Sequence, residues 1–190
     1  MTTLAPALYT RAFPRMANWL RDLMLISLGA LFVALLAQVK IPLPFTPVPL
    51  TGQTFAVLLV AATLGSKRGA ASMAFYIGLG AIGLPVFAGG AAGLAYLSGA
   101  TLGYLIGFIL AAYVIGLLAE RGLERSIRTS VIPFLVGTVI IYACGVSWLA
   151  VILGSYGKAL ATGLIPFVIG DVIKLIAASL VLPAAWKLAK

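Results

Sequence analysis

Two ionisable side chains of opposite charge, Asp171 and Lys174, lie within residues 164–182, a stretch that is otherwise apolar. A charge inside a membrane span costs free energy, so such a residue usually faces the interior of a helix bundle and marks a binding or transport pathway. The separation of three residues places both side chains on one face of a helix, close enough to pair. The pair could bind a polar ligand. Alternatively, the two charges only neutralise each other, and the pair holds neighbouring helices together.

Neutral polar side chains at the start of another apolar stretch could serve the same ligand. Thr51, Gln53 and Thr54 follow a proline-rich segment, residues 41–49. They offer hydrogen-bond donors and acceptors without charge. The distribution of basic residues places them on the same side of the membrane as Asp171. We therefore expect Thr51 and Gln53 to join Asp171 and Lys174 in a binding site.

The composition is that of a membrane protein. The chain has 190 residues, of which 63% are hydrophobic and 9% charged, and its mean hydropathy is +1.16. A water-soluble domain of this size does not need so much apolar surface, whereas a chain that crosses the bilayer several times does. Lys and Arg total 13 against 4 acidic residues, a net charge of +9. These basic residues lie between apolar runs, which fits signals of membrane topology better than a nucleic-acid surface.

Several kinds of site are excluded by the residues present. There is no histidine, and Cys144 is the only cysteine, so a disulfide within the chain, a thiolate metal site and a histidine-based catalytic triad cannot be assembled. No Gly-x-x-x-x-Gly-Lys-Ser/Thr motif occurs, so the chain cannot hydrolyse ATP through a P-loop. We therefore expect no enzyme, no metal and no cofactor.

The apolar runs predict an all-α membrane protein, a single bundle of six transmembrane helices. A perpendicular span needs about 20 residues, and two of the runs are shorter than this. Gly65 to Gly69 forms a charged, glycine-containing turn between these two short runs, so we expect a hairpin of short helices. The expected domains are a cytoplasmic N-terminal segment, residues 1–22, and a transmembrane substrate-binding domain, residues 23–190. The six runs are 23–39, 53–64, 70–84, 102–119, 131–153 and 163–182.

The basic residues orient these spans. With six spans, ten of them fall on one side and only Lys40 and Lys158 on the other, once intramembrane Lys174 is set aside. Basic loops stay in the cytoplasm, so we predict that both termini are cytoplasmic. Asp171 then lies about 12 Å into the last span, at 1.5 Å per residue, in the outer half of the membrane. The ten residues are Arg11, Arg15, Arg21, Lys67, Arg68, Arg121, Arg125, Arg128, Lys187 and Lys190.

The expected external loops are unusual. Residues 41–54 contain four prolines, and residues 83–99 are uncharged and rich in glycine; a third loop covers residues 154–162. Irregular backbone at membrane depth is tolerated only where it is buried in protein or lines a cavity. We interpret the first two loops as a cover over the bundle, although glycine and proline also serve simply as turn residues.

Four motifs stand out in the sequence: Pro44-Phe-Thr-Pro-Val-Pro-Leu-Thr-Gly-Gln-Thr-Phe55, Gly80-Ala-Ile-Gly-Leu-Pro-Val-Phe-Ala-Gly-Gly90, Gly103-Tyr-Leu-Ile-Gly-Phe108 and Gly170-Asp-Val-Ile-Lys174. They resemble the biotin transporter BioY family, the substrate-capturing S components of energy-coupling factor transporters. The resemblance covers most of the chain, with two departures. Residues 99–104 read Gly-Ala-Thr-Leu-Gly-Tyr where the family commonly has Gly-Pro-Thr-Gly-Gly-Tyr, and Ala91-Ala92 follow the glycine pair where many relatives have a polar or basic residue.

The resemblance implies an outward-facing biotin pocket in the plasma membrane of a prokaryote. In this interpretation Asp171 and Lys174 bind the polar groups of biotin, and Phe87 and Tyr104 wall its rings, with Gly89 and Gly90 in the loop above. An apolar pocket with a few convergent polar groups is the usual form of a small-ligand site. The resemblance also implies two protein partners, a transmembrane coupling subunit and ABC-type ATPase subunits.

A small-residue stripe on the first span is a candidate docking face for that coupling subunit. Ala30 and Ala34, four residues apart, permit close helix contact. They resemble the alanine motif by which S components dock. Packing within the chain is the alternative explanation.

Two other classes of function remain open from the residues alone. A self-sufficient secondary carrier for a small metabolite could use Asp171 as a proton relay, and its transport would survive the loss of every ATPase. An intramembrane enzyme fits least, because no nucleophile and base converge. High-affinity capture of biotin, energised by separate subunits, is the function we predict.

Overall fold

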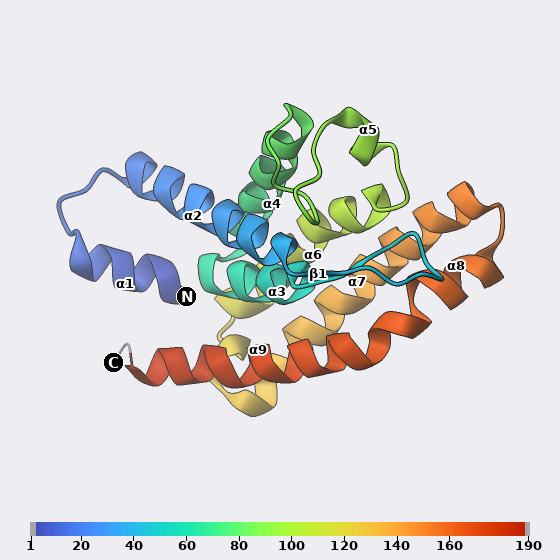
Figure 1. The fold of residues 1–190 in the computed structure, drawn as a ribbon. Helices are drawn as coiled ribbons and strands as arrows, with labels where there is room; N and C mark the ends of the chain where they lie inside the picture. Colours follow the sequence, from blue (N-terminus) through green and yellow to red (C-terminus); the bar gives the residue numbers. More distant parts are fainter. Residues whose placement is uncertain (1–2, 189–190) are drawn as a thin grey trace.

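Residues 3–188 are described by a computed structural model and fold into a helix bundle with a short antiparallel β-hairpin (Figure 1). In the hairpin, Lys40 pairs with Thr51 and Ile41 with Leu50. The elements in chain order are α1 (Leu4–Ala12), α2 (Asn18–Gln38), β1 (Lys40–Ile41), β2 (Leu50–Thr51), α3 (Gln53–Leu64), α4 (Ser66–Ala81), α5 (Leu94–Leu97), α6 (Leu102–Glu120), the 3-10 turn η1 (Leu123–Arg125), α7 (Ile127–Leu153), α8 (Tyr156–Gly163), the 3-10 turn η2 (Ile165–Phe167) and α9 (Val168–Leu188).

The apolar runs of the sequence coincide with helices α2, α3, α4, α6, α7 and α9. Within residues 3–188, four stretches are long and apolar enough to cross a membrane: Asn18–Gln38, Leu102–Glu120, Ile127–Leu153 and Tyr156–Lys187. The short hairpin is present, since α3 has 12 residues and α4 has 16. The chain is therefore mostly helical, with several helices of membrane-spanning character, as predicted.

Helix α3 lies at the centre of the bundle. It packs against α2, α4, α6 and α9, and most of its side chains are buried. Its sequence is apolar on every face, which is the pattern of a helix surrounded by protein. The residues at its N-terminal end, beginning with Gln53, are consequently held inside the bundle rather than at its lipid-facing surface.

The turn from α3 to α4 is fixed by a close approach of α6. Gly65 has a φ of +86°, which glycine adopts at little cost. Glu120, at the end of α6, accepts hydrogen bonds from the backbone N–H of Ser66 at 2.7 Å and from its hydroxyl at 2.8 Å. A carboxylate at the N-terminus of α4 is favoured by the helix dipole. Gly116, also on α6, lies so close to this turn that a side chain at position 116 would have no room.

The last apolar run is broken, which corrects the sequence prediction of a single span beginning at residue 163. The expected loop 154–162 is mostly helix α8, whose N-cap Ser155 accepts a hydrogen bond from the backbone N–H of Lys158 at 3.4 Å. Pro166 then lies in η2, and α9 begins at Val168. Asp171 is therefore in the first turn of α9, where the positive end of the helix dipole favours a carboxylate.

The alanine stripe of α2 faces inward. Ala30 is 1% exposed and Ala34 is 7% exposed, in a helix that packs on α3 and α4. A Cβ added at neighbouring Gly29 would lie 2.6 Å from Ser72 Oγ of α4, which shows how close the helices are. This burial agrees with packing within the chain, and docking of a coupling subunit at Ala30 and Ala34 stays a prediction.

The N-terminal segment predicted as residues 1–22 contains helix α1 and the first residues of α2. Leu4 and Pro6 are buried, and α1 packs against α3 and α2. Met1 and Thr2, like Ala189 and Lys190, lie outside the described residues. The segment therefore belongs to the bundle structurally, while the boundary at residue 22 stays a prediction.

The turn between α6 and α7 buries a carboxyl group. Glu124 is 0% exposed, and neither of its carboxyl oxygens has a hydrogen-bond partner among residues 3–188. Arg125 Nε lies 3.7 Å from Glu124 Oε1, beyond hydrogen-bond distance. Because burial disfavours the ionised form, the pKa of the Glu124 carboxyl is raised above its usual value. Ionisation of Glu124 is therefore less favourable in the folded chain than in the unfolded chain.

Replacing Glu124 by glutamine is expected to raise thermal stability at neutral pH. A raised pKa in the folded state gives a stability contribution that is present below the unfolded pKa and is lost as the pH rises through the folded pKa. The variant has no such loss, so its melting temperature should exceed that of the wild type at neutral pH and approach it in acid. Thermal unfolding of the detergent-solubilised chain across this pH range measures the difference. The control, Glu120→Gln, should lose stability, since it removes a carboxylate charge that is hydrogen-bonded at the N-terminus of α4. The prediction is wrong if the wild type melts at a higher temperature than Glu124→Gln and this difference grows as the pH rises.

Candidate functional site

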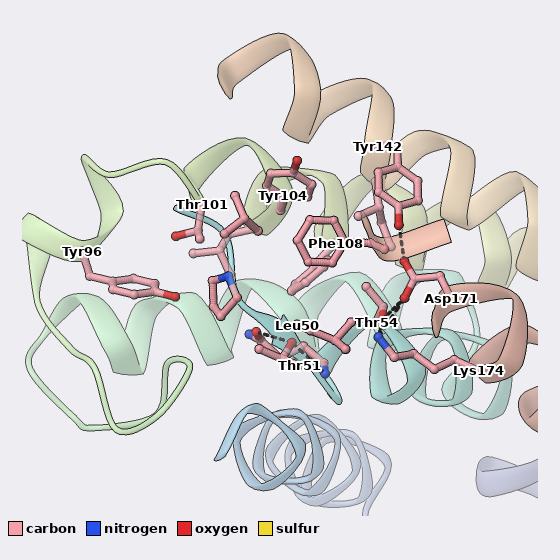
Figure 2. Close-up of a pocket in the computed structure, with 16 residues that line it drawn as sticks. Leu50, Thr51, Thr54, Tyr96, Thr101, Tyr104, Phe108, Tyr142, Asp171 and Lys174 are labelled. Atoms are coloured by element: carbon pink, nitrogen blue, oxygen red, sulfur yellow. Dashed lines mark hydrogen bonds and ion pairs between the residues drawn. The ribbon is translucent and has the colours of Figure 1, made fainter. Parts of the chain in front are cut away.

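A cavity of about 50 Å³ lies between the β-hairpin, the N-terminal end of α3, α6, α7 and the first turns of α9 (Figure 2). It receives Asp171 and Lys174 from α9, Thr54 from α3 and Tyr142 from α7, as Figure 2 shows. The hairpin and the segment within it form one wall. The lining residues are Val48, Pro49, Leu50, Thr51, Gln53, Thr54, Tyr96, Thr101, Tyr104, Leu105, Phe108, Ile141, Tyr142, Phe167, Asp171 and Lys174.

Asp171 and Lys174 form the ion pair that their spacing predicts. Lys174 Nζ lies 2.7 Å from Asp171 Oδ1. The Asp171 side chain is 9% exposed and that of Lys174 is 19% exposed. A charge-assisted hydrogen bond in such a shielded place is stronger than one in water. The prediction that these two residues share one helical face is confirmed.

Two further side chains hold the carboxylate in place. Thr54 Oγ1 donates to Asp171 Oδ1 at 3.0 Å, and the hydroxyl of Tyr142 donates to Asp171 Oδ2 at 2.5 Å. Lys174 Nζ also donates to Thr54 Oγ1 at 2.9 Å. Both carboxylate oxygens therefore accept hydrogen bonds, and the ammonium group uses two of its three donors. The network fixes a negative and a positive group at one end of the cavity.

Thr51 and Gln53 line the cavity at its side. The Gln53 side chain is 6% exposed; its Nε2 donates to the hydroxyl of Tyr76 at 2.8 Å, and its Oε1 accepts from Thr51 Oγ1 at 3.0 Å. Because the amide is held at both ends, it presents a fixed polar edge to the cavity. The structure thus brings Thr51, Gln53, Asp171 and Lys174 to one cavity, and their role in binding a ligand stays a prediction.

Aromatic rings form much of the apolar wall. Tyr104 and Phe108 come from α6 and Phe167 from η2, and each is less than a tenth exposed. The hydroxyl of Tyr104 donates to the backbone carbonyl of Gly163 at 2.7 Å, which ties α6 to the end of α8. Tyr96 reaches the cavity from α5 and lies at the far side from Asp171 in Figure 2.

Phe87, Gly89 and Gly90 do not line the cavity. Phe87 is fully buried behind Tyr96, with ring centroids 4.8 Å apart and planes inclined by 16°. Gly89 lies against Lys40, and Gly90 is exposed. Phe87 therefore supports Tyr96 in this conformation, and direct contact of these three residues with a ligand stays a prediction.

Tyr142 and Phe108 are the site residues that the sequence analysis did not identify as ligand-binding. Tyr142 places a hydroxyl inside the apolar run 131–153, and such a polar group in a span is itself a signal of an interior position. Phe108 gives no comparable signal, because an aromatic residue in an apolar helix is equally suited to lipid or to packing. Only the fold places it beside Asp171.

The proline-rich segment between β1 and β2 covers the cavity. Thr46 Oγ1 donates to the backbone carbonyl of Thr162 at 2.6 Å, which joins this segment to α8. Val48 is 7% exposed and contributes to the cavity wall. On the other side, Trp148 Nε1 donates to the carbonyl of Gly99 at 2.9 Å and joins α7 to the glycine-rich loop. The interpretation of residues 41–54 as a cover is thus supported by contacts to the rest of the bundle.

Comparison with known proteins identifies the family. A sequence profile of the BioY family matches residues 6–190. The biotin transporter BioY of Thermotoga maritima is 44% identical over 157 residues, which are 83% of this chain and 92% of the relative. The biotin transporter BioY of Rhizobium etli is 39% identical over 168 residues, 84% of this chain and 90% of the relative.

A solved structure has the same fold. The crystal structure of the S component for biotin from an ECF-type ABC transporter is 28% identical, with a TM-score of 0.81 over 90% of this chain and 95% of that one. The similarity therefore extends across the helices that supply the cavity. Because the family profile spans nearly the whole chain and close relatives share its length, the chain belongs to the BioY family.

Proposed function

We propose that this chain is the biotin-binding membrane subunit of a biotin uptake system. The observation that carries the proposal is the buried Asp171–Lys174 pair in a cavity with aromatic walls, in a chain of the BioY family. Relatives of 44% and 39% identity are named biotin transporters. Because these relatives are named transporters, the proposed role is capture and transport.

The chemistry of biotin fits the cavity. Its ureido ring carries two N–H donors and a carbonyl acceptor on an apolar bicycle, and its side chain ends in a carboxylate. Asp171 can accept from a ureido N–H, and Lys174 retains an N–H that can donate to the ureido carbonyl. The rings of Tyr104 and Phe108 offer apolar contact to the bicycle.

Biotin must widen the cavity as it binds. About 50 Å³ accommodates a few water molecules, since one water needs roughly 10–15 Å³ of such a cavity. The wall proposed to move is the segment around Val48, which lies between two short strands and contacts α8 through the Thr46–Thr162 hydrogen bond. This segment is the proposed entrance.

The proposed topology has six transmembrane helices, α2, α3, α4, α6, α7 and α9, with both termini in the cytoplasm. The ten-to-two distribution of basic residues supports this orientation. The biotin cavity then opens to the outside of a prokaryotic plasma membrane. Within this topology residues 1–22 remain the proposed cytoplasmic segment.

Energy for uptake is proposed to come from separate subunits. The sequence contains no P-loop motif, and the similar solved structure is an S component of an ECF-type ABC transporter. A transmembrane coupling subunit and ABC-type ATPase subunits are therefore the proposed partners. Docking of the coupling subunit at Ala30 and Ala34 stays a proposal, and both side chains are buried in the chain alone.

Titration of the purified chain with biotin tests the proposed function. We expect one biotin to bind per chain with a dissociation constant below about 1 μM. Lipoic acid is the matched control ligand, because it has the same five-carbon acid side chain but no ureido ring, and it should bind at least about 100-fold more weakly. No heat with biotin, or equal affinity for lipoic acid, would contradict the assignment.

Cysteine labelling tests the topology. Ser155→Cys and Ala92→Cys should react with a membrane-impermeant maleimide on intact cells, whereas Ser66→Cys and Ser126→Cys should react only after the membrane is opened. The natural Cys144 is replaced by alanine in all variants. Reversed labelling would overturn the orientation and the outward-facing cavity together.

A further inference from the structure

A second cavity lies at the other end of the molecule, beside α1. Its volume is about 430 Å³. The start of α2 supplies Arg21, the start of α4 supplies Arg68 and α1 supplies Arg11. In Figure 1 this is the end at the left, where α1 lies near the C-terminal part of α9, away from the hairpin and α8 that cover the biotin cavity.

The cavity has more positive than negative charge available to a ligand. Arg21 Nε and Arg68 Nε both bind the same carboxylate oxygen of Asp22, at 3.3 Å and 2.8 Å. Two guanidinium groups thus share one carboxylate. The carboxylate of Glu120, which also lines the cavity, is engaged by Ser66 at the N-terminus of α4. The remaining guanidinium N–H groups suit a phosphate, whose oxygens match their planar geometry.

A hydroxyl and an apolar wall complete the cavity. Arg21 donates through a terminal nitrogen to Thr10 Oγ1 at 3.3 Å, and Thr10 donates to the carbonyl of Pro6 at 2.8 Å. These contacts orient Arg21 toward the α1 wall. Pro6 and Leu64 contribute apolar surface next to the arginines. A ligand that joins an anionic group to an apolar part would satisfy both kinds of wall.

The surroundings place this cavity at the level of lipid headgroups. Beside it, large apolar side chains are turned outward: Leu8 is 43% exposed, Phe13 52% and Trp19 70%. Apolar residues on a short helix next to arginines, with a tryptophan at the start of a span, are typical of the membrane interface. A free phosphate in solution has no need of this apolar rim, whereas a phospholipid does.

We propose that this cavity binds the headgroup phosphate of an anionic phospholipid from the leaflet that surrounds α1. Arg21 and Arg68 donate to the phosphate oxygens, and the glycerol and acyl parts lie along the outward apolar residues of α1 and the start of α2. A basic pocket between helices at the cytoplasmic interface is a known form of lipid site in membrane proteins. The site shares no lining residue with the biotin cavity.

Native mass spectrometry of the full chain in dodecyl maltoside tests the proposal. Dioleoylphosphatidylglycerol should remain bound, with dioleoylphosphatidylcholine, which has the same acyl chains and no net charge, retained at least about tenfold less. Arg68→Gln should weaken retention of phosphatidylglycerol at least about tenfold, because one charge-assisted contact is lost. Asp22 still has Arg21 in this variant. Arg21→Gln, in which Asp22 keeps Arg68, is the second variant.

Lys67→Gln is the matched control, because it removes one positive charge a single residue from Arg68 on an exposed side chain that does not line the cavity. It should leave phosphatidylglycerol binding unchanged. Equal loss in this control, or equal retention of phosphatidylcholine, would overturn the site. Displacement of the lipid by millimolar inorganic phosphate would overturn the assignment to a phospholipid.

Discussion

Replacing Asp171 by asparagine is expected to weaken biotin binding at least about 100-fold without unfolding the chain. Asparagine keeps the size of the side chain, but it replaces a carboxylate oxygen by an NH₂ group and removes the charge. Lys174 would be left in a shielded position without its counter-charge, and Tyr142 or Thr54 would face a donor instead of an acceptor. Breaking a buried ion pair by removing one partner typically costs about 3–5 kcal/mol.

Calorimetric titration of the purified Asp171→Asn variant with biotin measures this loss. Asp22→Asn is the matched control: it makes the same chemical change at the opposite end of the bundle and should leave biotin affinity unchanged. Tyr142→Phe should give an intermediate loss of about tenfold, since it removes one hydrogen bond from Asp171 and keeps the charge. Wild-type affinity in Asp171→Asn would show that the pair is only structural.

Replacing Gly116 by alanine is expected to destabilise the fold strongly. A Cβ at this position would lie 2.2 Å from the backbone nitrogen of Ser66 and 2.4 Å from the carbonyl carbon of Gly65. These are backbone atoms, and Ser66 N is held by its hydrogen bond to Glu120, so they cannot move aside cheaply. The cost of forcing extra atoms into a packed interior is typically 1–3 kcal/mol, and contact with fixed backbone places this change at about the upper end.

The melting temperature of the solubilised chain measures this effect. A loss of about 3 kcal/mol should lower it by roughly 6–12 °C for a chain of this size. Gly78→Ala is the matched control, because Gly78 lies in helix α4 and an added Cβ would meet nothing within 4 Å. Alanine is the better helix former, so this control should be neutral or slightly stabilising. Equal stability of both variants would contradict the close packing of α6 on the α3–α4 turn.

The parts of the fold that depend on local sequence were predictable. Uninterrupted apolar runs gave the helices, and the spacing of Asp171 and Lys174 gave their contact, since three residues along a helix fix the direction of both side chains. Helix α8 was missed although its N-cap, Ser155, is visible in the sequence. The sequence alone predicts a loop over residues 154–162, whereas in the structure this segment is a short helix that packs against α7.

The parts that depend on which helix face points inward were not predictable. Most residues of α2 are apolar, so the sequence could not show whether Ala30 and Ala34 face a partner or the bundle; the structure buries both side chains. Tyr142 was missed for a related reason: its contact with Asp171 joins residues 29 positions apart in sequence. Such contacts are set by the packing of α7 on α9, which no local pattern records.

In the proposed topology, the shortness of α4 has a consequence for the lipid around the protein. Sixteen residues give α4 a length of roughly 24 Å, less than the hydrocarbon thickness of about 30 Å. Beyond the end of α4, Ile82 is 78% exposed, Leu84 45% and Leu94 72%, and these side chains extend the apolar surface without further helix. With α4 as a span, acyl chains next to its end therefore meet the side chains of a loop in place of a helix.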